Sequence, residues 1–256
     1  MKNIHQQEEA LQAEWLREAE RFGDADELCV DGLLFRGEIS NRDGYWHRER
    51  GDEEGTWNAA PRRLLILTKD LNDDEAWDIR QETGRTNTIA FNYEQALPFY
   101  KNLRMWSYLL LTATADNTPS FREARDMKVT GPFYEQAPIA RINCKKQVGN
   151  GSLADSTLLK YMHDYAPLLS RQIALYDANL LLCCGCSAGT NRILDFVRAQ
   201  YLPDLQYLPE CEDWIYYSPS TGKIAINSYH PSARISYEDT YERLAYAYKK
   251  FLTTKK

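Results

Sequence analysis

Four short apolar runs, separated by longer amphipathic segments, constrain the fold of this chain more than any other feature. The runs are residues 64–67, 139–142, 180–184 and 224–229, and polar residues follow each of them. Continuous apolar runs of this length are typical of strands that are buried on both faces of a sheet. Because helical segments alternate with them, the sequence predicts an α/β fold of three layers, α/β/α, with a short, mostly parallel central sheet.

The segments around these runs complete the expected architecture. Helices are predicted where apolar residues recur at helical spacing, over residues 4–22, 94–114, 157–176, 187–201 and 238–251. Pro167 should kink or restart the third of these helices, because proline cannot donate the hydrogen bond of a helix interior. Two further strands are expected over residues 28–35 and 214–217, and the polar residues 37–55 are expected to form a loop.

Composition limits the class of protein. The chain has 256 residues, 43% of them hydrophobic, which suits one large domain over residues 61–256 and an N-terminal helical extension and loop, residues 1–60, packed on its core. No apolar run approaches the roughly 20 residues that a membrane span needs, and the charged N-terminus does not resemble a secretory signal. The six cysteines lack the pattern of a disulfide framework and fit a reducing compartment. We therefore expect a cytoplasmic protein with no membrane contact.

The net charge of −6 differs from the basic excess of general nucleic-acid binders. Binding to phosphate depends on the local field, however, and Arg141, Lys145 and Lys146 bracket the end of one predicted strand. Solvated charges at the ends of strands are an equally good interpretation of these residues. Charge alone does not decide between the two.

Each of the four apolar runs leads directly into residues that can carry chemistry. In chain order these are Thr68-Lys69-Asp70-Leu71-Asn72, Asn143-Cys144-Lys145-Lys146, Gly185-Cys186-Ser187 and His230-Pro231-Ser232. The carboxyl ends of parallel strands meet at one edge of a sheet, which is where open α/β sheets usually bind ligands. We therefore expect one site.

The order and spacing of these segments, from about residue 62 to about residue 237, resemble the uracil-DNA glycosylase superfamily. Asp70 falls on the aspartate of the first motif of that family, Asn143 on the asparagine that reads the flipped base, and His230 and Ser232 on the histidine and serine of the last motif. The chain departs from the first motif at Thr68, which replaces a glycine, and at Leu71, which replaces a proline.

The resemblance implies a monofunctional DNA glycosylase, which hydrolyses an N-glycosidic bond after base flipping. Asp70 would orient water and stabilise the positive sugar, and His230 would donate a hydrogen bond to the departing base anion. Asn143 would pair with the edge of the extruded pyrimidine. A nucleophilic Lys69, as in bifunctional glycosylases, is an alternative that nothing in the sequence specifically favours.

Further residues are expected to bind the base or the DNA backbone. Phe99 is a candidate for stacking on the base, with Phe91 and simple core packing as alternatives. The phosphate contacts are assigned to five residues: Ser187, Ser232, Lys145, Lys146 and Arg234.

No cofactor and no obligate protein partner are implied; the expected partner is DNA. The iron–sulfur branches of the superfamily place cysteines where this chain has Gln147 and Tyr165, so the resemblance implies no cluster. Cys183 and Cys184 are neighbours in a predicted strand, so their side chains point to opposite faces and cannot easily share a metal ion.

The identity of the base depends on Asn72, which aligns with a tyrosine that excludes a methyl group at carbon 5 in the uracil-specific branch. The shorter side chain predicts a pocket that admits enlarged pyrimidines, such as the hydroxymethylated or glucosylated cytosines of phage DNA, which would indicate a defence enzyme. Repair of uracil is a comparable alternative.

A non-catalytic reader of modified or abasic DNA also stays open, because Thr68 and Leu71 depart from the motif. A hydrolase or transferase acting on a small nucleotide is a third possibility, although the chain has no nucleophile elbow and no phosphate loop.

Overall fold

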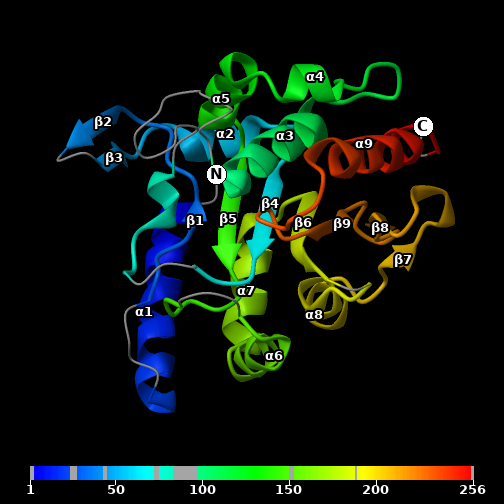
Figure 1. The fold of residues 1–256 in the computed structure, drawn as a ribbon. Helices are drawn as coiled ribbons and strands as arrows, with labels where there is room; N and C mark the ends of the chain where they lie inside the picture. The colour runs from blue at the N-terminus through cyan, green and yellow to red at the C-terminus, as the bar shows by residue number, and fades with distance from the viewer. Residues whose placement is uncertain are drawn as a thin grey trace.

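The four apolar runs form the centre of a seven-stranded sheet (Figure 1). This computed structural model describes residues 3–23, 28–42, 45–71, 75–82, 97–149, 153–187 and 189–254, with only the backbone for residues 45 and 46. The central strands are parallel and lie in the order β5 (Ile139–Asn143), β4 (Leu64–Thr68), β6 (Leu180–Cys186) and β9 (Ile224–Tyr229). The predicted parallel core of the sheet is confirmed.

Antiparallel strands extend the sheet at both edges. β1 (Gly32–Leu33) pairs with β5, while β8 (Ile215–Tyr217) pairs with β9, and β7 (Gln206–Tyr207) pairs with β8. The prediction of a short sheet is therefore wrong. β1 and β8 lie within the two further predicted strands, residues 28–35 and 214–217, whereas the two residues of β7 are too few to show a periodicity in the sequence.

Helices cover both faces of the sheet, and the alternation along the strands shows why. Leu65 and Leu67 of β4 point into one apolar cluster, and Leu64 and Ile66 point into another. The first cluster packs against α1 (Ile4–Phe22), α2 (Glu53–Ala59), α6 (Asp155–Asp164), α7 (Ala166–Tyr176) and α8 (Arg192–Gln200). The second packs against α3 (Pro98–Thr112), α4 (Phe121–Ala124), α5 (Met127–Gln136) and α9 (Tyr237–Thr254). The three-layer α/β/α arrangement is confirmed.

Several predicted boundaries agree with the structure. α1 and β9 have the expected bounds, and the helix predicted over residues 157–176 is divided at Pro167, which lies in the first turn of α7. Cys183 and Cys184 lie in different apolar clusters, on opposite faces of β6, as the strand pattern predicted.

Other boundaries differ. Residues 37–55 are not a loop: they contain the hairpin of β2 (Ile39–Arg42) and β3 (Tyr45–Arg48) and the beginning of α2. α8 begins at Arg192, not at Ser187, because the Asn191 side chain caps it by accepting from the N–H groups of Ile193 and Leu194. α4 and α5 were not predicted, nor were the short 3₁₀ helices η1 (Ile79–Gln81) and η2 (Pro209–Cys211).

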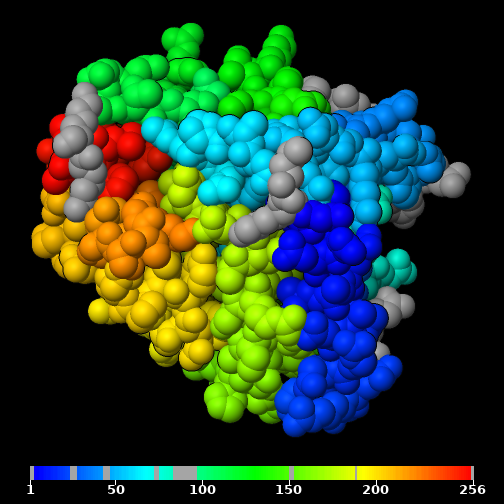
Figure 2. Space-filling view, turned by 180° about the vertical axis from the view of Figure 1, so that it is seen from behind, coloured from blue at the N-terminus to red at the C-terminus, as the bar shows by residue number. Residues whose placement is uncertain are grey.

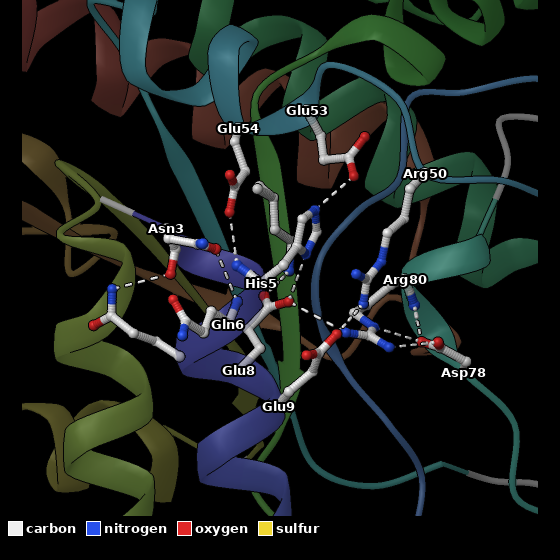
Figure 3. Close-up of polar contacts among 12 residues, drawn as sticks. Asn3, His5, Gln6, Glu8, Glu9, Arg50, Glu53, Glu54, Asp78 and Arg80 are labelled. Atoms are coloured by element: carbon white, nitrogen blue, oxygen red, sulfur yellow. Dashed lines mark hydrogen bonds and ion pairs between the residues drawn. The ribbon is translucent and has the colours of Figure 1, made fainter. Parts of the chain in front are cut away.

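The N-terminal segment is tied to the sheet by packing and by a polar network. In Figure 2, α1 runs beside the segment of α6 and α7, and it buries Ile4, Leu11 and Trp15. Figure 3 shows His5 of α1 between two carboxylates: His5 Nε2 lies 2.6 Å from Glu53 Oε1, and Nδ1 lies 3.1 Å from Glu8 Oε2. Because both ring nitrogens meet acceptors, this geometry favours the charged imidazolium. The network joins α1 to α2.

Within the described part of the chain, no helix combines the length and the apolar character that crossing a membrane requires.

Candidate active site

The register of the sheet brings four polar segments to one edge. Thr68 of β4 is paired with Asn143 of β5, and the ladder continues beyond both strands, because Lys145 donates its backbone N–H to Lys69 O at 2.9 Å. β9 lies on the far side of β6, and Cys186 is paired with Tyr229. Residues 69–70, 144–146, 187 and 230–232 therefore leave their strands at the same edge, where the sequence predicted one site.

Asp70 is half-buried at this edge, and the segment after β5 lies against it. A Cβ atom added to Gly149 would lie 3.1 Å from Asp70 Oδ2 and 3.5 Å from Lys145 Nζ. Burial raises the pKa of Asp70 above its ordinary value, while the charges of Lys145 and Lys69 lower it in part. The site thus contains a carboxylate in a partly desolvated, cationic surrounding.

His230 is held in one tautomer by the loop that follows it. The backbone N–H of Ser232 donates to His230 Nδ1 at 3.2 Å, so the neutral ring carries its proton on Nε2. Burial, together with the charges of Lys69 and Arg141, lowers the pKa of His230 to about 4. At neutral pH this imidazole is an uncharged hydrogen-bond donor through Nε2.

An aromatic ring lies against the histidine. The Phe99 ring is centred 5.8 Å from that of His230, and the Arg141 guanidinium lies 4.7 Å from the Phe99 centroid. Arg141 is buried and ion-paired with Glu82, which accepts a second hydrogen bond from the Tyr134 hydroxyl at 2.5 Å. The predicted Phe99 is thus brought to the site and held there by an anchored cation.

The loop of His230 is also fixed from α3. Asn102, which lies one turn after Phe99, donates its Nδ2 to Pro231 O at 2.6 Å and is buried. α3 therefore holds both the ring beside His230 and the bend that follows it. Nothing in the local sequence marked Asn102 for this contact.

The charge of Lys69 acts on both Asp70 and His230. Its ammonium lies 3.2 Å from Asp155 Oδ1, at the beginning of α6. The Lys69 charge lowers the pKa values of both Asp70 and His230, so it acts on the carboxylate and on the imidazole together. An ammonium paired with a carboxylate is charged, and this does not favour Lys69 as a nucleophile.

The geometry of Asn143 differs from the expected base-reading position. Its side chain is 0% exposed, and its Oδ1 accepts a hydrogen bond from the Thr68 hydroxyl. Its Nδ2 lies 3.5 Å from Cys29 Sγ. Both ends of the amide are thus used inside the protein, and a base could reach them only after these contacts opened.

Lys146 does not reach the surface, so its predicted phosphate contact is wrong. Its side chain is 1% exposed, and its ammonium donates to both oxygens of Asp31 at 2.6 Å. Asp31 also accepts from Gln172 Nε2 and from the Asn143 backbone N–H, so the charge is balanced internally. A buried, satisfied ion pair cannot neutralise DNA phosphates.

Lys145 is likewise turned inward. Its ammonium donates to Gln147 O at 2.8 Å and to Val148 O at 2.9 Å, and the residue is buried. Its role as a direct phosphate contact is not supported by this geometry.

The remaining predicted phosphate residues lie at the surface. Ser187, Ser232 and Arg234 are exposed, which leaves their side chains accessible to a backbone phosphate. Ser187 forms a tight turn with Thr190, since each backbone N–H donates to the carbonyl of the other. Asn72 and Phe91 lie outside the described residues. The prediction of a pocket for enlarged pyrimidines, which depends on Asn72, therefore stays a prediction.

Within the described residues, no group of three histidine, cysteine or acidic side chains is arranged to hold a metal ion. No protein-family model matches the chain, and no curated protein matches it significantly.

Proposed function

We propose that the protein is a monofunctional DNA glycosylase that hydrolyses the N-glycosidic bond of a flipped pyrimidine. One observation carries this proposal: a partly buried carboxylate, Asp70, and a neutral imidazole, His230, follow two parallel strands, β4 and β9, that flank β6 and end at the same edge of the sheet. Hydrolysis of such a bond develops positive charge on the sugar and negative charge on the base. The two groups have the chemistry that these opposite charges require.

Each residue has a defined task in this mechanism. Ionised Asp70 orients the attacking water and stabilises the oxocarbenium-like sugar. His230 donates its Nε2 proton as a hydrogen bond to the departing base, and the nearby Lys69 and Arg141 charges favour the anion. Phe99, which already lies against His230, supplies a ring on which a base can stack. The exposed Ser232 and Arg234 are positioned to contact the DNA backbone next to the flipped nucleotide.

A non-catalytic reader of modified or abasic DNA is the second candidate. Its abasic form is favoured by the Asn143 amide, which is already occupied by Thr68 and Cys29, because recognition of an abasic site needs no free amide to read a base. The glycosylase is preferred because a reader has no need for a carboxylate and a neutral histidine in one site.

The test uses purified protein and duplexes that carry one uracil, hydroxymethylcytosine, glucosylated hydroxymethylcytosine or unmodified cytosine. After incubation, alkali cleaves the strand at any abasic site. We expect cleavage at a uracil or at an enlarged cytosine, and loss of cleavage in Asp70→Asn and His230→Ala. Binding without cleavage by the wild-type protein would favour the reader.

The same series decides the base. Release of an enlarged cytosine would support a role in defence against phage DNA. Release of uracil alone would end the enlarged-pocket hypothesis and indicate repair.

A further inference from the structure

Lys145 is buried at the edge of the site, and its ammonium binds backbone carbonyls of the segment that follows it. It donates to Gln147 O and Val148 O, and it lies 5.4 Å from the centroid of the Tyr161 ring of α6. Two carbonyls bound to one ammonium bend the segment after β5 back onto the sheet. A parallel bridge between Val148 and Leu71 joins this segment to the one that carries Asp70.

The bent segment ends against the Asp70 carboxylate. Gly149 leaves little room at this point, because a methyl group would lie 3.1 Å from Asp70 Oδ2, so the carboxylate would have to move by a few tenths of an ångström. The same methyl position is 3.5 Å from Lys145 Nζ. The lysine, the glycine and the carboxylate thus meet around one point.

We propose that Lys145 is a positioning residue, whose ammonium folds residues 147–149 against the Asp70 carboxylate and so fixes the place of that carboxylate in the site. The catalytic role of the Asp70 carboxylate rests on the proposed function, but the contacts of Lys145 with residues 147–149 do not depend on it. Among the described residues, the charged groups that act on Asp70 are Lys145 after β5 and Lys69 after β4. Lys69 is shared with Asp155 of α6 and with His230.

The experiment measures the titration of Asp70 by NMR of protein with ¹³C-labelled aspartate carboxyl groups, assigned through Asp70→Asn. Lys145→Met removes the charge and both donors, whereas Lys145→Gln removes the charge and keeps an N–H donor. The matched control is Lys223→Met, because Lys223 is also buried, donates to Asp177 and to Ala178 O, and lies over the ring of Tyr201.

We expect the Asp70 pKa to rise in both Lys145 variants and to stay at the wild-type value in Lys223→Met, since a lost neighbouring cation disfavours the carboxylate. In the pH profile of the rate of base release, the acid limb should move to higher pH. The Lys145 variants should therefore be slower than wild type by about three- to tenfold at the lowest pH of the profile, and by less at the highest pH. An unchanged Asp70 titration in the Lys145 variants would overturn the inference.

A second variant keeps the test decisive if neither Lys145 variant folds. Gly149→Ala retains the lysine and crowds Asp70 alone, so the Asp70 carboxyl signal should shift and its titration should change. A wild-type signal in Gly149→Ala would show that the segment does not control the carboxylate, and the inference fails. If the wild-type protein releases no base, the proposed function fails, while the titration still decides the role of Lys145.

Discussion

At the scale of single residues, the environment of each side chain decides which of the candidate groups can act. Asp70 and His230 are partly buried and near cations. Burial raises the pKa of Asp70 against those charges, whereas burial and the charges together lower the pKa of His230, so that its imidazole is neutral. Asn143 was predicted for the same site from its motif position, and Lys145 and Lys146 from their charge at the end of a strand. Their polar atoms are used inside the protein, which a motif cannot reveal.

The protonation of His230 gives a prediction at this scale. Because its pKa is about 4, titration of His230 should not change base release between pH 5 and pH 8, the range where an ordinary histidine changes its charge. His230→Ala should lower the single-turnover rate by about 10²–10³-fold, as loss of one transition-state donor does. Titration of the imidazole by ¹⁵N NMR provides the check, and a midpoint near 6.5 would contradict it.

At the scale of elements, strand ends and helix caps place the site. The bend after β6 depends on Asn191, which caps α8 and also donates to Cys183 O and to Asn227 Oδ1. Gly185 is required beside it, because a Cβ atom there would lie 2.8 Å from Asn191 Oδ1. One asparagine therefore connects β6, β9 and α8 behind the candidate site.

Replacement of this cap should be costly. Asn191→Ala removes the cap and two further hydrogen bonds, so the free energy of unfolding should fall by about 2 kcal/mol. Asn191→Asp keeps the acceptor for the helix N–H groups but loses the donors, so its free energy of unfolding should lie between those of wild type and Asn191→Ala. Denaturant unfolding of these variants, with the exposed Ser187→Ala as control, tests this; equal stability of Asn191→Ala and Ser187→Ala would refute it.

At the scale of the whole molecule, the N-terminal segment is held to the sheet by the charged network in Figure 3. Burial alone would lower the pKa of His5, but its contacts with Glu53 and Glu8 outweigh burial and raise it to about 9. Burial would raise the pKa of Glu53, but hydrogen bonds from His5 and from backbone N–H groups lower it to about 2. The pair is thus ionised over a wide range of pH.

This network predicts how stability depends on pH. The raised pKa of His5 contributes stability that is complete below about pH 6.5, its ordinary value, and is lost as the pH rises through 9. The lowered pKa of Glu53 contributes stability above about pH 4.5 that is lost as the pH falls through 2. His5→Asn should therefore lower the free energy of unfolding by about 1–3 kcal/mol near pH 6 and by less near pH 9.5.

Denaturant unfolding of wild type and His5→Asn at both pH values measures this difference. A loss that is the same at pH 6 and pH 9.5 would mean that the charge of His5 does not stabilise the N-terminal segment.

Local patterns in the sequence were sufficient to predict the parallel core of the fold. Residues 64–67 form a continuous apolar run and are buried on both faces of the sheet, so this strand can be recognised from local sequence. The restart of the helix at Pro167 can be recognised in the same way. The sequence also determined that Asp70 and His230 leave strands at one edge, because strand direction fixes that edge. Only the tertiary structure decided which polar groups face outward. The contact of Lys146 with Asp31 joins residues 115 positions apart, and that of Asn102 with Pro231 joins residues 129 apart. Such long-range pairing depends on packing, and no local pattern records it.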